Sequence, residues 1–414
     1  MKKSDMIIKI NEMLEYNTQI NKCFRPLVEE FCIRIGEQYN LNEKQFEEKL
    51  ELFKRLTISF DENLKYLSGH YKENMEYLKD KDCFYLPNQE ICFNTFLLKY
   101  LYTRKEEYIK ELIITSFHEL GHNVQRHVNK DIWDTGISRN NKYISEDNSI
   151  RISTQGEILN EIANTITANR LFNGNIKQDN YQGYSNTINT GIGIIRSLGM
   201  NEDIISQILM KGNGREDYLN YIRSELGDNY LDYVLEIEDD LDILYGLTFQ
   251  YEVENDENNK NQIREKIANH YYEIIEDSNR IIEQRIKIAE KKNLSKDYAK
   301  IIFDKYKRDN EFRIAKEKNH ELFPNDFEID SKMEIQEIND LIEKLGGEKV
   351  NKAIEILEDQ ENENEKNNIH YNNHQFYERV YNSVSKYNLN RFSQETRAKL
   401  LSYKNNQDEI EAER

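Results

Sequence analysis

Two histidines and a glutamate, all within residues 118–122, are the residues in this sequence best suited to chemistry. They form the His-Glu-x-x-His pattern of His118, Glu119 and His122. On a helix, residues four apart lie on one face, so both imidazoles can point at a single metal ion. Glu119 lies beside the place where a bound water would sit, and its carboxylate could accept the proton of that water. The pattern therefore predicts a zinc site together with its general base.

The residues around this motif keep the spacing of an amphipathic helix. Apolar residues recur at intervals of three and four, while the two histidines fall on a neighbouring face; the apolar positions are Ile113, Phe117, Leu120, Val124 and Val128. Gly121 costs about 1 kcal/mol relative to alanine inside a helix. We therefore interpret Gly121 as a position that leaves room for an ion, a water or a crossing strand.

Two histidines leave a zinc ion one short of the three protein ligands that catalytic sites usually provide. We expect the third ligand on a helix that starts near Thr154, with Ser153 or Thr154 as its N-cap, and runs to Phe172. Glu157 and Glu161 share one face of it. Two carboxylates on an otherwise uncharged stretch are costly to bury unless a positive charge pairs with them, and a zinc ion would supply that charge.

The arrangement resembles the gluzincin metallopeptidases, in which a glutamate on a later helix, often preceded by asparagine, completes the His-Glu-x-x-His site. Leu159-Asn160-Glu161 matches that element, and the Thr135–Ser138 loop ahead of it is similar to an arrangement in gluzincin-like proteins of low-GC bacteria. The resemblance covers about residues 83 to 215. It implies a zincin-like catalytic domain with one Zn²⁺ per chain, held by His118, His122 and Glu161.

One position departs from the gluzincin pattern. Thermolysin-like members carry an acid four residues after the glutamate ligand, where it orients a zinc-bound histidine, and Thr165 stands at that position here. If Glu157 were the ligand, Glu161 would occupy the orienting position, as in the Glu-x-x-x-Glu arrangement of lethal-factor-like peptidases. We favour Glu161, since orienting carboxylates are common but replaceable by other acceptors, and keep Glu157 as the alternative.

Composition sets the class of protein and excludes some partners. Only 16 Gly and 3 Pro among 414 residues favour a mainly helical chain with a small β-hairpin or sheet. The net charge of −19 argues against binding to nucleic acid or to an anionic membrane surface. No apolar run long enough for a transmembrane helix or a signal peptide is present, so we expect a cytoplasmic protein.

The chain is expected to have three parts. Residues 1–80 form an N-terminal helical segment, 81–250 form the metallopeptidase domain, and 251–414 form a charged helical C-terminal region with a flexible linker near 359–368. Two apolar runs within 83–96 flank Pro87-Asn88 and predict a hairpin, which is either an edge strand for an extended substrate or a small structural sheet. The C-terminal helices are a candidate surface for a protein partner.

Several other residues are of types that could serve the site. His127 is five residues beyond His122 and turns away from its face, which favours a surface residue at the helix end. His370 and His374 lie beside the linker and are also expected at the surface. Many gluzincins aim a phenol at the oxyanion; the candidates here are Tyr143, Tyr181 and Tyr184, and the choice among them is open.

Two functions from different classes follow. The first is a zinc peptidase that hydrolyses a peptide or protein substrate with Glu119 as general base. The second is a non-catalytic helical scaffold or effector in which the metal site is structural or vestigial. Glu119 favours the first, because a purely structural site has no use for a carboxylate at that position.

Overall fold

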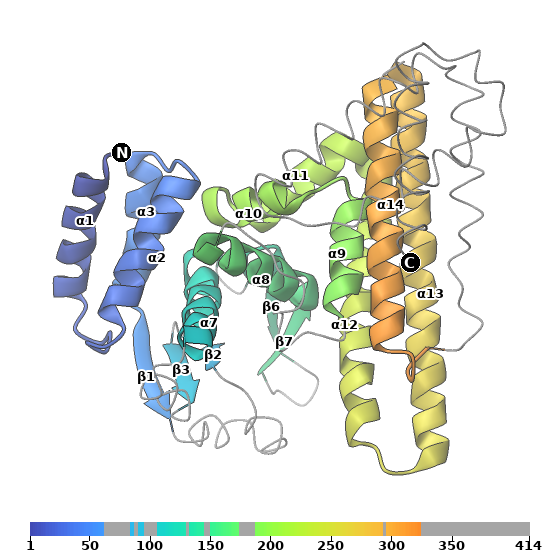
Figure 1. Cartoon of the computed structure of the whole chain (residues 1–414), viewed down its shortest axis with the longest axis horizontal. Coiled ribbons are helices and arrows are strands. Elements are labelled where there is room, and N and C mark those ends of the chain that lie inside the picture. The colour runs from blue at the N-terminus through green and yellow to red at the C-terminus, as the bar shows by residue number, and fades with distance from the viewer. Residues whose placement is uncertain are drawn as a thin grey trace, which may run out of the picture. The chain divides into compact units, whose positions relative to one another are not determined.

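The computed structural model describes residues 1–61, 83–86, 90–94, 106–129, 132–144, 150–173, 187–292 and 295–323. Of these residues 77% are helical, and the others include a few small sheets, which confirms the expected mainly helical class. The chain divides into two compact units: Met1–Ser185 with Met200–Arg223, and Asn186–Gly199 with Ser224–Arg414. The N-terminal helices and the motif helix thus belong to one unit, whereas the division expected from the sequence separates them at residue 80. Figure 1 shows the elements of each unit.

Three helices open the first unit: α1 (Lys3–Tyr16), α2 (Arg25–Gln38) and α3 (Glu43–Phe53). Local signals start two of them. Pro26 lies in the first turn of α2, and Asn42 with Gln45 forms a capping box at α3. Phe31 of α2 is fully buried and meets Phe117 of the motif helix edge-on, with ring centroids 5.5 Å apart. These helices therefore form part of the core on which the motif helix rests.

A three-stranded sheet follows, in the order β1-β3-β2. The predicted hairpin is present: β2 (Cys83–Leu86) and β3 (Glu90–Asn94) pair antiparallel, with Cys83 opposite Phe93. The third strand, β1 (Thr57–Asp61), runs parallel to β3. The sequence had been expected to stay helical up to residue 80, and this expectation is wrong at β1. The short Thr-Ile-Ser-Phe run gains its strand conformation from pairing with a segment more than thirty residues away.

The segment of chain between the motif helix and the next helix forms a second sheet. Its strands are β4 (Arg126–Asn129), β5 (Ile132–Thr135), β6 (Ser138–Ile144) and β7 (Ile150–Gln155), each antiparallel to the one before. The Thr135–Ser138 loop expected from the sequence is the tight turn between β5 and β6, with Thr135 paired to Ser138. Gly136, at φ +60°, takes the first central position of the turn between β5 and β6, where a tight hairpin needs a residue with positive φ.

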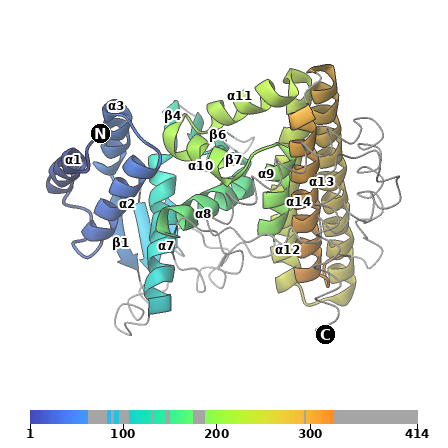
Figure 2. The ribbon, with the colours of Figure 1, turned by 45° about the horizontal axis from the view of Figure 1, so that its top comes forward.

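The two helices that carry the candidate site are α7 (Glu106–Val124) and α8 (Glu157–Asn173). The predicted apolar stripe overshoots the end of α7, since Val128 belongs to β4. The predicted N-cap residues of α8 belong to β7, and Gly156, at φ +70°, joins that strand to α8. α10 (Glu202–Lys211) packs on α8, and α11 (Arg215–Leu226) follows it. Figure 2 gives a second view of these elements.

α7 and α8 cross at Gly121. A Cβ atom built on Gly121 would lie 2.3 Å from Oδ1 of Asn164 on α8. The space beside Gly121, expected from the sequence to take an ion, a water or a strand, is therefore filled by the Asn164 amide of the crossing helix. Asn164 is itself fixed, since its Nδ2 donates to the His118 carbonyl at 2.6 Å and its Oδ1 accepts from Gln125 Nε2 at 2.8 Å.

A buried lysine holds the C-terminal end of α7. Lys49 of α3 donates from Nζ to the carbonyl oxygen of Val124, the last residue of α7, at 2.8 Å. The end of a helix carries a partial negative charge that favours a cation. Burial nevertheless lowers the pKa of Lys49 to about 8, because removing the ammonium from water disfavours its charged form.

The regular secondary structure described in the second unit is all helical. Its elements are α9 (Ile188–Ser197), the 3-10 turn η4 (Asp228–Tyr230), α12 (Leu231–Val253), α13 (Glu257–Lys292) and α14 (Ser295–Lys318). Arg285 of α13 donates to the carbonyls of Arg196 and Ser197 at the end of α9 and to Asp304 of α14, so one guanidinium joins three helices. The expected boundary between residues 250 and 251 falls inside α12, and α12 packs on α13 within this unit. The predicted linker at 359–368 lies outside the described residues.

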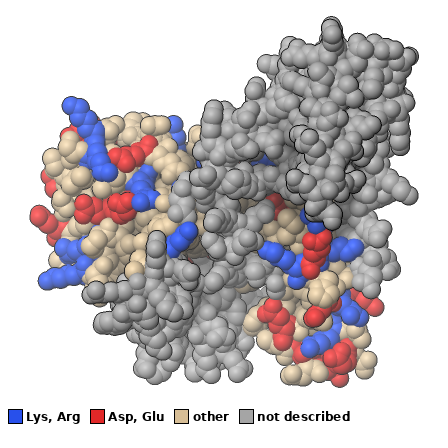
Figure 3. All heavy atoms as spheres, viewed as in Figure 1, with Lys and Arg blue, Asp and Glu red and all other residues tan. Residues whose placement is uncertain are grey.

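Within the part of the chain that the structure describes, none of the helices has both the length and the apolar character needed to cross a membrane. Figure 3 shows acidic and basic side chains interspersed on the visible surface of the N-terminal helices, although the whole chain carries a net charge of −19.

The crossing at Gly121 predicts opposite effects for two glycine substitutions. Gly121→Ala should lower the free energy of unfolding by about 1–3 kcal/mol, because the new methyl group displaces an amide held by two hydrogen bonds. Gly246→Ala in α12 is the matched control. No atom lies within 4 Å of its added Cβ, so it should gain up to about 1 kcal/mol of helix propensity. Chemical denaturation followed by circular dichroism measures both; a stabilised Gly121→Ala would contradict the close crossing.

The depressed pKa of Lys49 predicts a pH-dependent stability. Below about pH 8 the ammonium is charged in both the folded and the unfolded state, and the desolvation penalty is present in full. Between about pH 8 and 10.5 the folded state releases its proton first, so stability rises with pH, by at most about 3 kcal/mol. Lys49→Met removes this contribution. The difference in unfolding free energy between the two proteins should change across this window; parallel pH profiles would show that Lys49 is not desolvated.

Candidate metal centre

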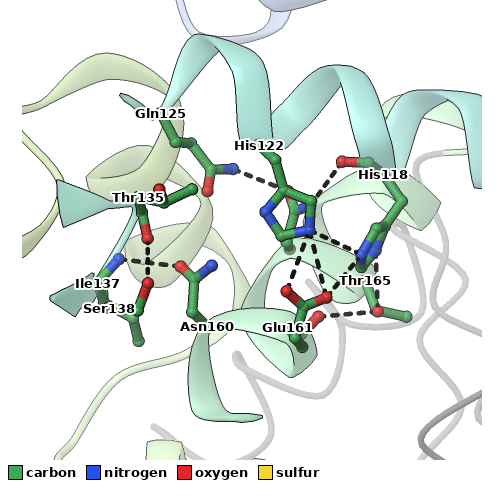
Figure 4. A network of polar contacts seen from close by, with 10 residues as sticks. His118, His122, Gln125, Thr135, Ile137, Ser138, Asn160, Glu161 and Thr165 are labelled. Atoms are coloured by element: carbon green, nitrogen blue, oxygen red, sulfur yellow. Dashed lines mark hydrogen bonds and ion pairs between the residues drawn. The ribbon is translucent and has the colours of Figure 1, made fainter. Parts of the chain in front are cut away.

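Three side chains from α7 and α8 converge on one point. Nε2 of His118 lies 2.9 Å from Oε2 of Glu161, and Nε2 of His122 lies 3.0 Å from Nε2 of His118 and 3.2 Å from both carboxylate oxygens of Glu161. Figure 4 shows the two imidazoles above the carboxylate, with the histidines supplied by α7 and the glutamate by α8. The helical spacing of four places the histidines, and the crossing of the helices brings the carboxylate to them.

This group fits a divalent metal ion such as zinc. Ligands bound tetrahedrally at the usual zinc–nitrogen distance lie about 3.3 Å from one another, close to the spacings found here. Two imidazoles and one carboxylate also form the donor set of a catalytic zinc site that keeps one position for water or substrate. The contact between two imidazole nitrogens supports the same reading, since at most one proton can lie between them and the two lone pairs otherwise repel.

The electrostatics keep Glu161 ionised. Burial by itself would raise the pKa of this carboxyl, but the nearby charge of His122 and the hydrogen bonds with both histidines outweigh it. The net pKa of Glu161 lies well below its ordinary value. A metal ligand must be deprotonated to bind, so the fold already holds this carboxylate in its binding form.

Glu157, the alternative ligand, lies one turn before Glu161 and is exposed. Its pKa is raised, first because its carboxyl is partly desolvated and second because the Glu161 carboxylate is near. The group of ligand atoms within 4.8 Å of one another contains His118, His122 and Glu161, and Glu157 is not a member. Glu119 is buried on α7, directly after His118, with 8% of its surface exposed.

A set of uncharged polar residues surrounds the ligands. Thr165 Oγ1 lies 3.2 Å from Nδ1 of His118 and donates to the Glu161 carbonyl at 2.8 Å. Asn160 Oδ1 accepts from the backbone N–H of Ile137 at 2.9 Å, which ties the β5–β6 turn to α8. In the sequence, Asn160 is distinguished only as part of the Asn-Glu pattern, and Thr165 only as a departure from the gluzincin pattern. Asn164 was missed, although an amide in the same apolar stretch of helix was a signal that something polar must face it.

Among the described residues, the other histidines and the tyrosines considered for the site are not part of the ligand group. His127 belongs to β4, opposite Asp134 of β5, and is not in the ligand group. Its pKa is lowered, first by burial and then by the charge of Lys49. Tyr143 lies in β6, opposite Arg151. Tyr181, Tyr184, His370 and His374 lie outside the described residues.

A second cluster was not foreseen. Nδ1 of His270 on α13 lies 2.8 Å from Oδ1 of Asp240 on α12 and 3.3 Å from Oε2 of Glu273. Glu273 is exposed, and one N–H at Nδ1 of the imidazole, lying between two carboxylates, accounts for these contacts without a metal ion. This cluster is therefore interpreted as a hydrogen-bonded group.

The geometry predicts how metal content responds to single substitutions. Wild type should bind about one zinc ion per chain. His122→Ala and Glu161→Gln should lose it, because each removes a ligand atom, whereas Glu157→Gln and His270→Ala should keep it. Elemental analysis after exhaustive dialysis measures the content. Loss of metal in Glu157→Gln but not in Glu161→Gln would make Glu157 the ligand.

The chain was compared with models of protein families, with curated proteins and with solved structures, and none of the three comparisons found a match. The assignment of the centre therefore rests on the geometry and chemistry of its own residues.

Proposed function

We propose that this protein is a zinc-dependent peptidase with a zincin-like, gluzincin-type domain in its first unit. The observation that carries the proposal is the convergence of His118, His122 and Glu161 within 2.9–3.2 Å of one another, with Glu119 adjacent to the first ligand on the same helix. A site of three ligands with a neighbouring carboxylate is suited to hydrolysis.

Each residue of the centre would have a separate role in peptide hydrolysis. A bound zinc ion would make its water more acidic and polarise the scissile carbonyl. His118, His122 and Glu161 would hold the ion. Glu119 would accept the proton of the attacking water and pass it to the leaving amine, so a single carboxylate would serve as general base and then as general acid. The substrate on this reading is a peptide or protein.

The alternative is a helical scaffold or effector with a structural or vestigial site. One observation favours it: the contacts of Glu161 at 2.9 and 3.2 Å can also be made by a protonated imidazole, as in an ordinary buried ion pair. In that case the described helices of the second unit would offer the partner surface, and Glu119 would have no chemical task.

Glu119→Gln separates the two functions. The substitution removes the proton acceptor and keeps the size of the side chain, so peptide hydrolysis should fall by about 10²–10⁴-fold while zinc content stays at the wild-type level. Cleavage of a peptide library by zinc-loaded protein, followed by mass spectrometry, measures it. Glu48→Gln, at an exposed position of α3, makes the same chemical change away from the centre and should leave the rate unchanged. Equal rates for wild type and Glu119→Gln would remove the proposed base, and no cleavage by zinc-loaded wild type would favour the scaffold.

A further inference from the structure

Thr165 contacts both helices of the metal centre through one hydroxyl group. The residue is nearly buried on α8, one turn after Glu161. Its Oγ1 lies 2.8 Å from the carbonyl oxygen of Glu161 and 3.2 Å from Nδ1 of His118 (Figure 4). It therefore touches the ring of one ligand on the side opposite to the nitrogen that faces the other ligands.

The proton count of this hydroxyl decides what it can do for His118. A threonine hydroxyl carries one proton, and a carbonyl oxygen can only accept. When Thr165 donates to the Glu161 carbonyl, its oxygen can only accept from the ring, so Nδ1 of His118 must carry the proton. Nε2 is then left with its lone pair, on the side where His122 and Glu161 lie, and a bound metal ion would accept that lone pair in place of the Nε2–H contact with Glu161. This is the protonation pattern that a metal-binding imidazole requires.

The surroundings of His118 leave its ring little freedom. Asn164, the residue before Thr165, donates to the His118 backbone carbonyl at 2.6 Å. Three residues of α8 thus act on this one histidine: Asn164 on its backbone, Thr165 on Nδ1 and Glu161 on Nε2. An acid at position 165 could also accept from Nδ1, but it would put a second negative charge next to the buried Glu161. A hydroxyl accepts the same hydrogen bond without that charge.

We propose that Thr165 is a positioning residue that fixes His118 in the tautomer protonated on Nδ1 and so directs its Nε2 lone pair into the metal centre. The inference rests on the proposed function in that it takes His118 as a metal ligand. The group that orients the His118 ring is then a neutral hydroxyl, on the same helix as the Glu161 carboxylate.

Three variants test the proposal. Thr165→Val keeps the shape of the side chain and removes the hydroxyl, and Thr165→Ser keeps the hydroxyl and removes the methyl group. Thr167→Val is the matched control, because Thr167 makes the same bond to the carbonyl four residues before it, on the same helix, and its other bond goes to Ser206 and not to a ligand. Proton and nitrogen NMR of the zinc-loaded protein, in which the Nε2 lone pair of His118 would be bound to the metal, measures how fast the Nδ1 proton of His118 exchanges with water. Competition with a chromophoric chelator gives the Zn²⁺ affinity of each protein.

We expect a slowly exchanging Nδ1 proton on His118 in wild type, Thr165→Ser and Thr167→Val, because the Thr165 hydroxyl accepts it, and a rapidly exchanging one in Thr165→Val. The Zn²⁺ affinity of Thr165→Val should fall by about 10–100-fold, while that of the other two variants stays within about twofold of wild type. Equal exchange rates of the Nδ1 proton in wild type and Thr165→Val, or an unchanged affinity in Thr165→Val, would overturn the proposal. Neither measurement needs a substrate. Absence of peptidase activity with the expected exchange rates and affinities would therefore refute the proposed function and leave the role of Thr165 standing.

Discussion

The structure of the candidate site depends on how closely two helices cross. α7 and α8 meet where Gly121 has no side chain, and the amide of Asn164 fills the space. Any larger residue would hold the helices farther apart, and the carboxylate of Glu161 would then move away from the two imidazoles. The helix-breaking tendency of a glycine is thus accepted inside the motif because it permits this approach.

The crossing is polar rather than apolar. Asn164 uses both ends of its amide, donating to the His118 carbonyl and accepting from Gln125, while Asn160 accepts from Ile137 in the β5–β6 turn. Buried amides must find partners, so a shift of one helix along the other would leave several of them unsatisfied. This requirement fixes the register of the helices more tightly than interdigitated apolar side chains would. A fixed register is what a ligand set divided between two helices needs.

The packing of α7 against α8 contributes to the stability of the fold and also determines the geometry of the candidate site. Glu161 lies in the first turns of α8 and the two histidines in the last turns of α7, so the three side chains meet only while the two helices are packed. Lys49 anchors the end of α7 from α3, although its burial weakens its own charge. The hairpin between β5 and β6 is attached to both helices through Asn160 and through the bond from Gly136 to the Gln125 carbonyl. The N-terminal helices and the second sheet thus support the site.

The sequence by itself determined the features that repeat along one segment. A spacing of four put His118 and His122 on one face of a helix, and the scarcity of glycine and proline favoured helices throughout. The tertiary structure alone decided the features that join distant segments. The strands from Thr57 and from Arg126 onward were missed because their conformation depends on pairing partners. The angle and depth of a helix crossing decide three features of the site. They decide that Glu161 meets the histidines, that the Asn164 amide fills the space at Gly121, and that Thr165 faces Nδ1 of His118. Local periodicity fixes the direction of a side chain relative to its own helix, but not the position of one helix relative to another.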